Sequence, residues 1–227
     1  MIEKVNAIIL SSSSYLENDL LLQVYTKEYG LLGIIIKGAN KVNSKRKSLC
    51  LVYSKIEYTI DIKPYKTLYI PKDIQLLDNH KHILFDMTLA SVSAVICELT
   101  YKSSINNELY NLLEYSLLKI NKDNCLLVLA TYIKKLIVYN GLNPNLDNCI
   151  HCHNEITCWF SYQDGSLLCH NCTNNILEDY LIDNLKKLFS TNDIVIVDLK
   201  LIDIIINYYL YHTNIKLNSY DIMKVII

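Results

Sequence analysis

The sequence predicts an α+β chain, with a small β-barrel at the amino-terminal end followed by a helical region that carries a four-cysteine insert. Short apolar or alternating segments fill the first 80 residues, and helical periodicity begins after them. Two Cys-x-x-Cys pairs then interrupt the helical pattern. We therefore expect a barrel over residues 1–79 and an otherwise all-helical region over residues 80–227, with the insert at about residues 147–174.

Five strands are expected in the first part of the chain. Their segments are rich in Ile, Val, Tyr and Leu, and breaks such as residues 11–14 and Pro64 separate them. Tyr58, Ile60 and Ile62 alternate with polar residues, which is typical of a half-buried strand. Five short strands in succession predict a closed barrel, for which the OB-fold is the commonest candidate and a small SH3-like barrel is the alternative. The predicted strands cover residues 5–10, 20–26, 31–37, 49–60 and 67–77.

Helices are expected from residue 80 onward. Apolar residues recur every three or four positions over residues 83–97 and again over residues 109–120. A third helix should begin after a cap at Asp123 and end at Gly141, because aspartate caps helix amino termini and glycine follows carboxyl termini. The remaining predicted helices cover residues 177–189 and 199–213, with a short one near the end.

Composition narrows the class of protein. With 51% hydrophobic and 20% charged residues, the 227-residue chain has the balance of an ordered globular protein and needs no disulfide to fold. No apolar run reaches the ~18 residues of a membrane-spanning helix, and the first residues lack the segments of a signal peptide. We therefore expect a cytoplasmic protein without a membrane partner. The net charge is −1, but residues 1–80 carry +3, so the first part is the basic one.

The cysteines fall into two groups. Cys50, Cys97 and Cys125 lie singly in apolar stretches and are expected to be small core residues. The pattern C-x2-C-x16-C-x2-C has a spacing at which two tight turns supply four sulfurs to one tetrahedral zinc ion. A redox-active pair is the alternative interpretation, but it leaves the second pair without a role. The predicted metal ligands are Cys149, Cys152, Cys169 and Cys172.

The predicted metal site is structural. Four thiolates would fill the coordination sphere of zinc, whereas a catalytic zinc keeps one position for water. We therefore expect one structural zinc ion per chain. His151, His153 and His170 should be exposed polar residues at its rim. Cys158 lies in a segment, residues 156–162, that is typical of a strand in a ribbon hairpin, so it should be a packed thiol.

A basic segment follows the third predicted strand. It contains five cations and no acid within eleven residues, and it connects two strands of the predicted barrel. Loops and sheet faces of OB-folds commonly bind single-stranded nucleic acid, so we interpret the segment as a phosphate-binding loop rather than a merely solvated one. The residues predicted to bind are Lys37, Lys41, Lys45, Arg46 and Lys47.

The sequence contains no motif that argues for an enzyme: it has no glycine-rich phosphate loop, Gly-x-Ser-x-Gly turn or His-Glu-x-x-His pair. Glu17 and Asp19 stand two residues apart near a turn, where a local structural role is favoured over an acid pair. Tyrosines of the barrel could stack on bases, although packing is the commoner role of a strand tyrosine. These are Tyr25, Tyr53, Tyr58, Tyr65 and Tyr69.

Seven segments match one known family in order and spacing. They are YLEND at 15–19, YTKEYG at 25–30, LLGIIIKGA at 31–39, YNGLNPNLDNC at 139–149, GSLLC at 165–169, YYLYH at 208–212 and KLNS at 216–219. Through these segments the chain resembles, over nearly its full length, the RecO family of bacterial recombination mediator proteins.

The resemblance implies an amino-terminal OB-fold that binds DNA and a helical carboxy-terminal domain that carries zinc. It implies a non-enzymatic protein of the nucleoid that binds single- and double-stranded DNA, anneals complementary strands and, with RecR, loads RecA onto strands coated by single-stranded-DNA-binding protein. By similarity, the cations of the basic segment would contact the DNA. The alternatives are a zinc-stabilised adaptor whose barrel binds proteins and, as a third class, a thiol oxidoreductase.

Overall fold

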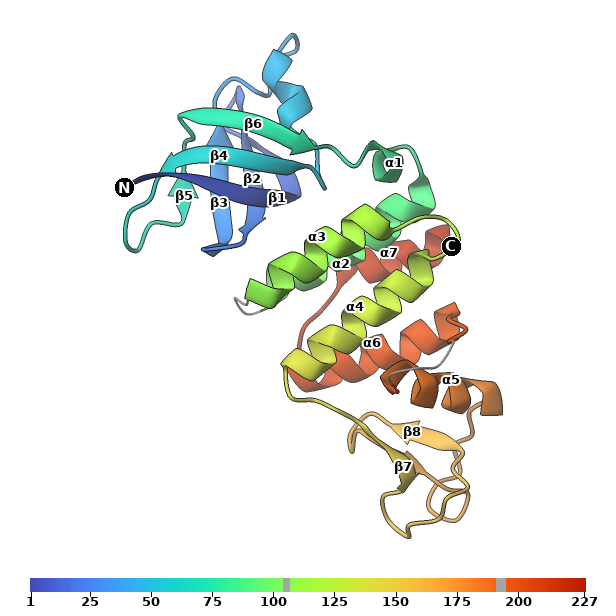
Figure 1. Cartoon of the computed structure of the whole chain (residues 1–227). Helices are drawn as coiled ribbons and strands as arrows, with labels where there is room; N and C mark the ends of the chain where they lie inside the picture. The colour runs from blue at the N-terminus through green and yellow to red at the C-terminus, as the bar shows by residue number, and fades with distance from the viewer. Residues whose placement is uncertain (104–106, 191–194) are drawn as a thin grey trace. The chain divides into compact units, whose positions relative to one another are not determined.

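The computed structural model describes residues 1–103, 107–190 and 195–227 (Figure 1). The chain divides into two compact units, which we call unit 1, residues 1–122 with 217–227, and unit 2, residues 123–216. Among the described helices, none combines the length and the apolar character that crossing a membrane requires.

Unit 1 begins with a six-stranded sheet in the order β5-β3-β2-β1-β4-β6. Neighbouring strands are antiparallel except β3 and β5, which run parallel. The strands β5 and β6 stand at the two ends of this order, although only residues 70–72 separate them in the chain. The strands are β1 (Ile2–Tyr15), β2 (Asp19–Thr26), β3 (Gly30–Ile36), β4 (Lys55–Asp61), β5 (Leu68–Tyr69) and β6 (Asp73–Asp78).

The core of this sheet follows from the alternation in its strands. In β2, Leu20, Leu22 and Val24 are buried, and the two residues between them are only half-buried. Ile34 of β3 and Ile56 of β4 are fully buried in the same apolar cluster. Each such side chain contributes about 1.5–3 kcal/mol through burial, so the cluster holds the strands and fixes where their connecting loops leave the sheet.

The observed strands differ from the predicted ones in three places. Residues 11–14, expected as a break, extend β1 and pair with residues 20–23. They are exposed serines, so their strand is held by backbone pairing and leaves no apolar pattern in the sequence. Residues 45–50 form a 3-10 helix, η1 (Lys45–Cys50), so β4 begins later than predicted. The predicted strand 67–77 divides around Pro71, which has no N–H to donate to a neighbouring strand.

The described part of unit 1 also contains four α-helices. Asp86 caps α2, because its Oδ1 accepts the N–H of Leu89 at 3.0 Å. The helices α2 and α7 pack against each other. Their contact includes Glu98 of α2, whose Oε2 accepts the N–H of Ser219 at 2.8 Å. The helices are α1 (Lys81–Leu84), α2 (Met87–Lys102), α3 (Asn107–Lys119) and α7 (Asn218–Ile226).

Unit 2, as far as its residues are described, contains three helices and a small sheet in the order β7-β9-β8. The helix α4 packs against α6, and both contact α5. The hydroxyl of Tyr208 on α6 donates to the Leu142 carbonyl at 2.7 Å, and the Tyr208 ring meets Phe160 of β8 edge-on at 5.3 Å. These contacts attach the sheet to the helices. The elements are α4 (Cys125–Tyr139), β7 (Asn145–Cys149), β8 (Trp159–Ser161), β9 (Ser166–Leu168), α5 (Asp179–Phe189) and α6 (Leu199–Thr213).

The α+β class is as predicted: a β-sheet domain precedes a helical region that contains a small sheet and a four-cysteine cluster. Cys50, Cys97 and Cys125 are buried, as expected. The prediction of Asp123 as a helix cap is wrong by one residue, since Asn124 occupies the capping position of α4. Helix ends are set by local hydrogen bonds, and such shifts by one or two residues are common.

Candidate metal centre and nucleic-acid interface

The four predicted metal ligands lie at, or just after, the carboxyl ends of two neighbouring strands of unit 2. Cys149 is the last residue of β7, and Cys169 directly follows β9. Because β7 and β9 pair in parallel, both strands lead into their Cys-x-x-Cys turns at the same end of the sheet. Each turn folds back on its first cysteine: the N–H of His153 donates to the Cys149 carbonyl at 2.8 Å, and that of Cys172 to the Cys169 carbonyl at 2.9 Å.

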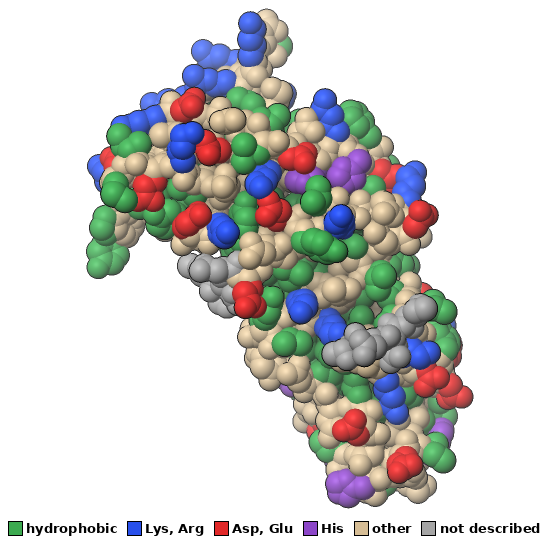
Figure 2. All heavy atoms as spheres, in the orientation of Figure 1, with side chains coloured by type: hydrophobic (Ala, Val, Ile, Leu, Met, Phe, Trp, Pro, Cys, Tyr) green, Lys and Arg blue, Asp and Glu red, His purple; other side chains and the backbone are tan. Residues whose placement is uncertain are grey.

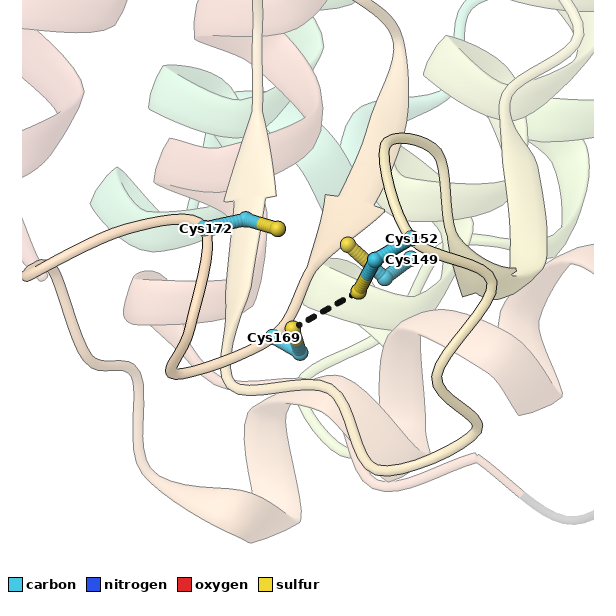
Figure 3. Close-up of side chains that lie close together, drawn as sticks. All are labelled: Cys149, Cys152, Cys169 and Cys172. Carbon is cyan, nitrogen blue, oxygen red and sulfur yellow. Dashed lines mark hydrogen bonds between the residues drawn. The ribbon is translucent and has the colours of Figure 1, made fainter.

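The sulfur atoms of the four cysteines lie within 4.8 Å of one another (Figure 3). The Sγ atoms of Cys152 and Cys169, which belong to different pairs, are 3.3 Å apart. Zinc binds thiolates at about 2.3 Å, so neighbouring sulfurs of a tetrahedral site are about 3.8 Å apart, and the cluster has the donor set and the size for such an ion. Within the described ranges, no other group of His, Cys, Asp or Glu residues is arranged to hold a metal. These clustered cysteines could bind a metal ion such as zinc.

The backbone around the cluster favours negative charge on one sulfur. Burial raises the pKa of the Cys149 thiol, but the N–H groups of Cys152, Cys169 and His151 donate toward its sulfur, and the pKa falls to about 6. Hydrogen bonding with Cys152 and Cys149 raises the pKa of Cys172 to about 12. A metal ion bound here would displace the remaining protons, because only thiolates ligate zinc.

The other candidate residues of the insert lie outside the cluster. His151, His153 and His170 are exposed, as predicted. Cys158 is buried, and its thiol donates to the Asn175 carbonyl at 3.7 Å, as expected for a packed residue. The sequence separated these residues from the four clustered cysteines because each Cys-x-x-Cys turn presents its two outer positions to the same point.

The basic loop, residues 37–47, leaves the end of β3 and is tied at both ends. The N–H of Gly38, at φ +70°, donates to Oδ1 of Asp19 at 2.8 Å. Nη1 of Arg46 donates to the Lys37 carbonyl at 3.2 Å and so joins the end of the loop to its start. Ser44 caps η1 by accepting the N–H of Arg46. The loop is therefore a shaped structure, and Asp19 has the local structural role that the sequence favoured.

Cations surround a depression in the basic loop. All five predicted phosphate-binding residues are exposed, and no described residue forms an ion pair with any of them. Figure 2 shows Lys and Arg side chains gathered where the loop and η1 project from the sheet of unit 1. Lys47 does not line the depression, which has a volume of about 410 Å³. Its lining residues are Lys37, Gly38, Lys41, Asn43, Ser44, Lys45 and Arg46.

Two features of these sites could not be recognised from the sequence. One is the bond from Arg46 to the Lys37 carbonyl, because the sequence marks Arg46 only as one of five charges. The other is the parallel pairing of β7 with β9, which brings the two cysteine pairs together. Both depend on the path of the backbone, and residue types alone do not record that path.

The amino-acid sequence is similar to that of known proteins over most of its length. Residues 1–80 match the family model described as "Recombination protein O N terminal", and residues 84–221 match "Recombination protein O C terminal". The DNA repair protein RecO of Thermoanaerobacter sp. is 30% identical over 77% of this chain and 73% of its own. The protein of that name from Alkaliphilus metalliredigens is 28% identical over 76% and 72%, and that from Bacillus pumilus is 28% identical over 76% and 69%. The chain belongs to the RecO family of DNA repair proteins.

Proposed function

We propose that this protein binds single- and double-stranded DNA through the basic loop, anneals complementary strands and, with RecR, helps load RecA onto strands coated by single-stranded-DNA-binding protein. Its family is one of non-catalytic recombination mediators. The observation that carries the proposal is the depression in the basic loop, where Lys37, Lys41, Lys45 and Arg46 meet without a compensating acid. Unpaired cations around a concave surface suit phosphate oxygens. Such a protein would act in the cytoplasm, on the nucleoid.

The proposed DNA-binding domain is an OB-type barrel over residues 1–79, followed by a helical domain over residues 80–227. Closure of the barrel is supported by the segment that forms both β5 and β6, because its start pairs with β3 and its end pairs with β4. The N–H of Gly33 also donates to the Thr67 carbonyl at 2.7 Å, next to the parallel pair. The basic loop then connects two strands at the rim of the barrel.

The proposed role of the cysteine cluster is to hold one structural zinc ion per chain, with Cys149, Cys152, Cys169 and Cys172 as ligands. Four sulfurs leave no position for a reacting water. When bound, the ion would hold the ends of β7 and β9 together where their turns meet. The insert, residues 147–174, has only a small apolar cluster of its own. The metal would therefore stabilise the fold of this insert and would not take part in a reaction.

A charge-reversal titration tests the proposed function. If all five loop cations contact single-stranded phosphates, the logarithm of affinity should fall with the logarithm of salt concentration with a slope of about −3.5. The combined variant Lys45→Glu, Arg46→Glu and Lys47→Glu should weaken binding of a labelled oligonucleotide strongly. The variant Lys63→Glu, Lys66→Glu and Lys72→Glu is the matched control, since it reverses three exposed lysines of the same barrel outside the loop.

Two outcomes would contradict the proposal. Equal losses in both triple variants would remove the basic loop from the site. Absence of any salt-sensitive oligonucleotide binding by the wild-type protein would favour the protein-binding adaptor. A strand-annealing assay with the same variants connects binding to activity, because annealing should be lost in parallel with affinity.

A further inference from the structure

The five tyrosines named in the sequence analysis are unsuited to base stacking. Tyr25, Tyr53, Tyr58 and Tyr69 are all buried in the core of unit 1. Tyr65 is fully exposed, but it lies in a loop and lines no described pocket. None of these five tyrosines therefore offers an exposed ring face beside a described pocket.

Such a surface occurs at a pocket of unit 1 between the β1–β2 ladder and α2. The pocket has a volume of about 480 Å³, large enough for a nucleobase with its sugar. Tyr101 of α2 stands in its wall with 45% of its surface exposed. The other lining residues are Leu10, Ser11, Gln23, Tyr53, Ala94, Cys97, Glu98, Lys102 and Asn218.

The polar groups of the pocket suit an uncharged ligand. Gln23 and Ser11 face each other across the β1–β2 ladder, and neither side chain has a hydrogen-bond partner among the described residues. The carboxylate of Glu98 is engaged by Lys102 at 2.7 Å and by the start of α7. The pocket thus offers a ring face, an amide and a hydroxyl beside an already neutralised ion pair. An amide that donates and accepts at once is suited to the edge of a base, and an aromatic ring to its face.

The strand β1 leads from the pocket toward the basic loop. Ser11, Ser13 and Tyr15 follow one another on the same face of the strand, and Tyr15 pairs with Asp19, which holds Gly38 of the loop. From Ser11 to Tyr15 the strand extends about 14 Å, at about 3.4 Å per residue. A single strand with phosphates on the basic loop would therefore reach the pocket within a few nucleotides.

We propose that this pocket receives one unstacked nucleobase of a bound single strand, with Tyr101 stacking on the base and Gln23 hydrogen-bonding to its edge. The proposal rests on the proposed function, because the basic loop must hold the phosphates. A base in an intact duplex cannot enter without unpairing, so the pocket adds affinity for single strands only.

The test compares a mixed-sequence oligonucleotide with an abasic backbone of equal length. Wild-type protein should bind the normal strand more tightly, by about fivefold or more, since stacking of one base has an effect of that order. Tyr101→Ala and Gln23→Ala should weaken binding of the normal strand to the level of the abasic one, with the salt slope unchanged. Tyr101→Phe should keep the preference, because the ring remains. Tyr65→Ala is the matched control and should behave as wild type.

Two results separate failure of the pocket from failure of the loop. If wild-type protein binds normal and abasic strands equally, or if Tyr101→Ala retains the preference, the pocket is not a base site and the basic loop stands alone. If neither strand binds the wild-type protein, the proposed function fails and the pocket proposal fails with it. Quenching of a 2-aminopurine base, present in wild type and Tyr101→Phe but absent in Tyr101→Ala, would identify the stacking ring directly.

Discussion

Glu98 of α2 caps α7 through Ser219, a residue 121 positions further along the chain. Its Oε2 accepts both the backbone N–H and the hydroxyl of Ser219, and its Oε1 accepts the N–H of Asn218 at 3.3 Å. The first N–H groups of a helix have no partner within the helix, and Leu217, at the capping position, supplies no side-chain bond. A carboxylate from another helix therefore does what a local capping residue usually does.

Replacing Glu98 by Gln should destabilise unit 1 in a pH-dependent way. Burial raises the pKa of Glu98, but hydrogen bonds from Lys102, Ser219 and Asn218 outweigh it and lower the pKa to about 2. A carboxyl whose folded pKa is depressed stabilises the fold above its ordinary pKa near 4.5, and that contribution is lost as the pH falls toward 2. This lowering of the Glu98 pKa corresponds to a contribution of at most about 3 kcal/mol to the free energy of unfolding at neutral pH.

Hydrogen exchange of α7 at pH 7 and pH 3 measures this effect. Wild-type protein should lose protection between the two values, whereas Glu98→Gln should be weakly protected at both. Glu17→Gln, at an exposed position in the β1–β2 turn, is the control and should change stability by less than about 0.5 kcal/mol. Equal protection of α7 in wild type and Glu98→Gln would show that the cap contributes little.

Removal of the metal should unfold the insert of unit 2. Trp159 is the single tryptophan of the chain and packs against the cluster, so its fluorescence reports on this segment. We expect one zinc ion per chain by elemental analysis and a red-shifted Trp159 emission after chelation, because structural zinc contributes on the order of 10 kcal/mol to folding. Cys149→Ser should abolish zinc retention and Cys158→Ala should preserve it. A metal-free protein with an exchangeable disulfide would instead support the oxidoreductase alternative.

Gly165 and Gly141 provide a matched pair of substitutions in unit 2. Both have positive φ, +60° and +69°, so alanine at either costs about 1–2 kcal/mol in backbone conformation. A Cβ at Gly141 would meet nothing within 4 Å, whereas one at Gly165 would stand 2.7 Å from the Tyr208 hydroxyl. Gly165→Ala should therefore cost a further 1–3 kcal/mol, roughly, through overpacking. Denaturant unfolding followed by Trp159 fluorescence should show this difference, and equal midpoints would contradict it.

Arg46 and Lys45 should have different effects on DNA binding. Arg46→Lys keeps the charge but loses the planar group that donates to the Lys37 carbonyl. It should lower affinity with an unchanged salt slope and should accelerate hydrogen exchange in residues 37–47. Lys45→Ala should make the salt slope shallower by about 0.7 and leave exchange in the loop unchanged. If Arg46→Lys instead leaves both affinity and exchange as in wild type, the bond to Lys37 does not shape the loop.

The parts of the molecule that the sequence predicted are those with local signals. The cysteine spacing encodes two turns, and the run of cations encodes an exposed loop, so residue types and their spacing are enough to name the members of both. Helices α2, α4 and α6 have apolar periodicity over three or more turns, and each lies near its expected range.

The parts that the sequence did not predict depend on partners distant in the chain. The serines at 11–14 belong to β1 because they pair with residues 20–23, and no local sequence pattern predicts this pairing. Neither Glu98 nor Ser219 alone predicts a helix cap, because the cap forms only when the two residues come into contact in the fold. Gln23 and Tyr101 likewise share a pocket that arises from packing of α2 on the outer face of β1 and β2.

The position of α7 within unit 1 has a consequence for synthesis on the ribosome. Unit 2 is inserted between residues 122 and 217, so unit 1 remains without α7 until all of unit 2 has emerged. The nascent sheet and α2 therefore leave the ribosome with the α7-contacting side of α2 uncovered, although domains generally fold from the amino-terminal end. Translation that stops anywhere within unit 2 would release a unit 1 with that side still open, and such fragments would be natural substrates for chaperones and proteases.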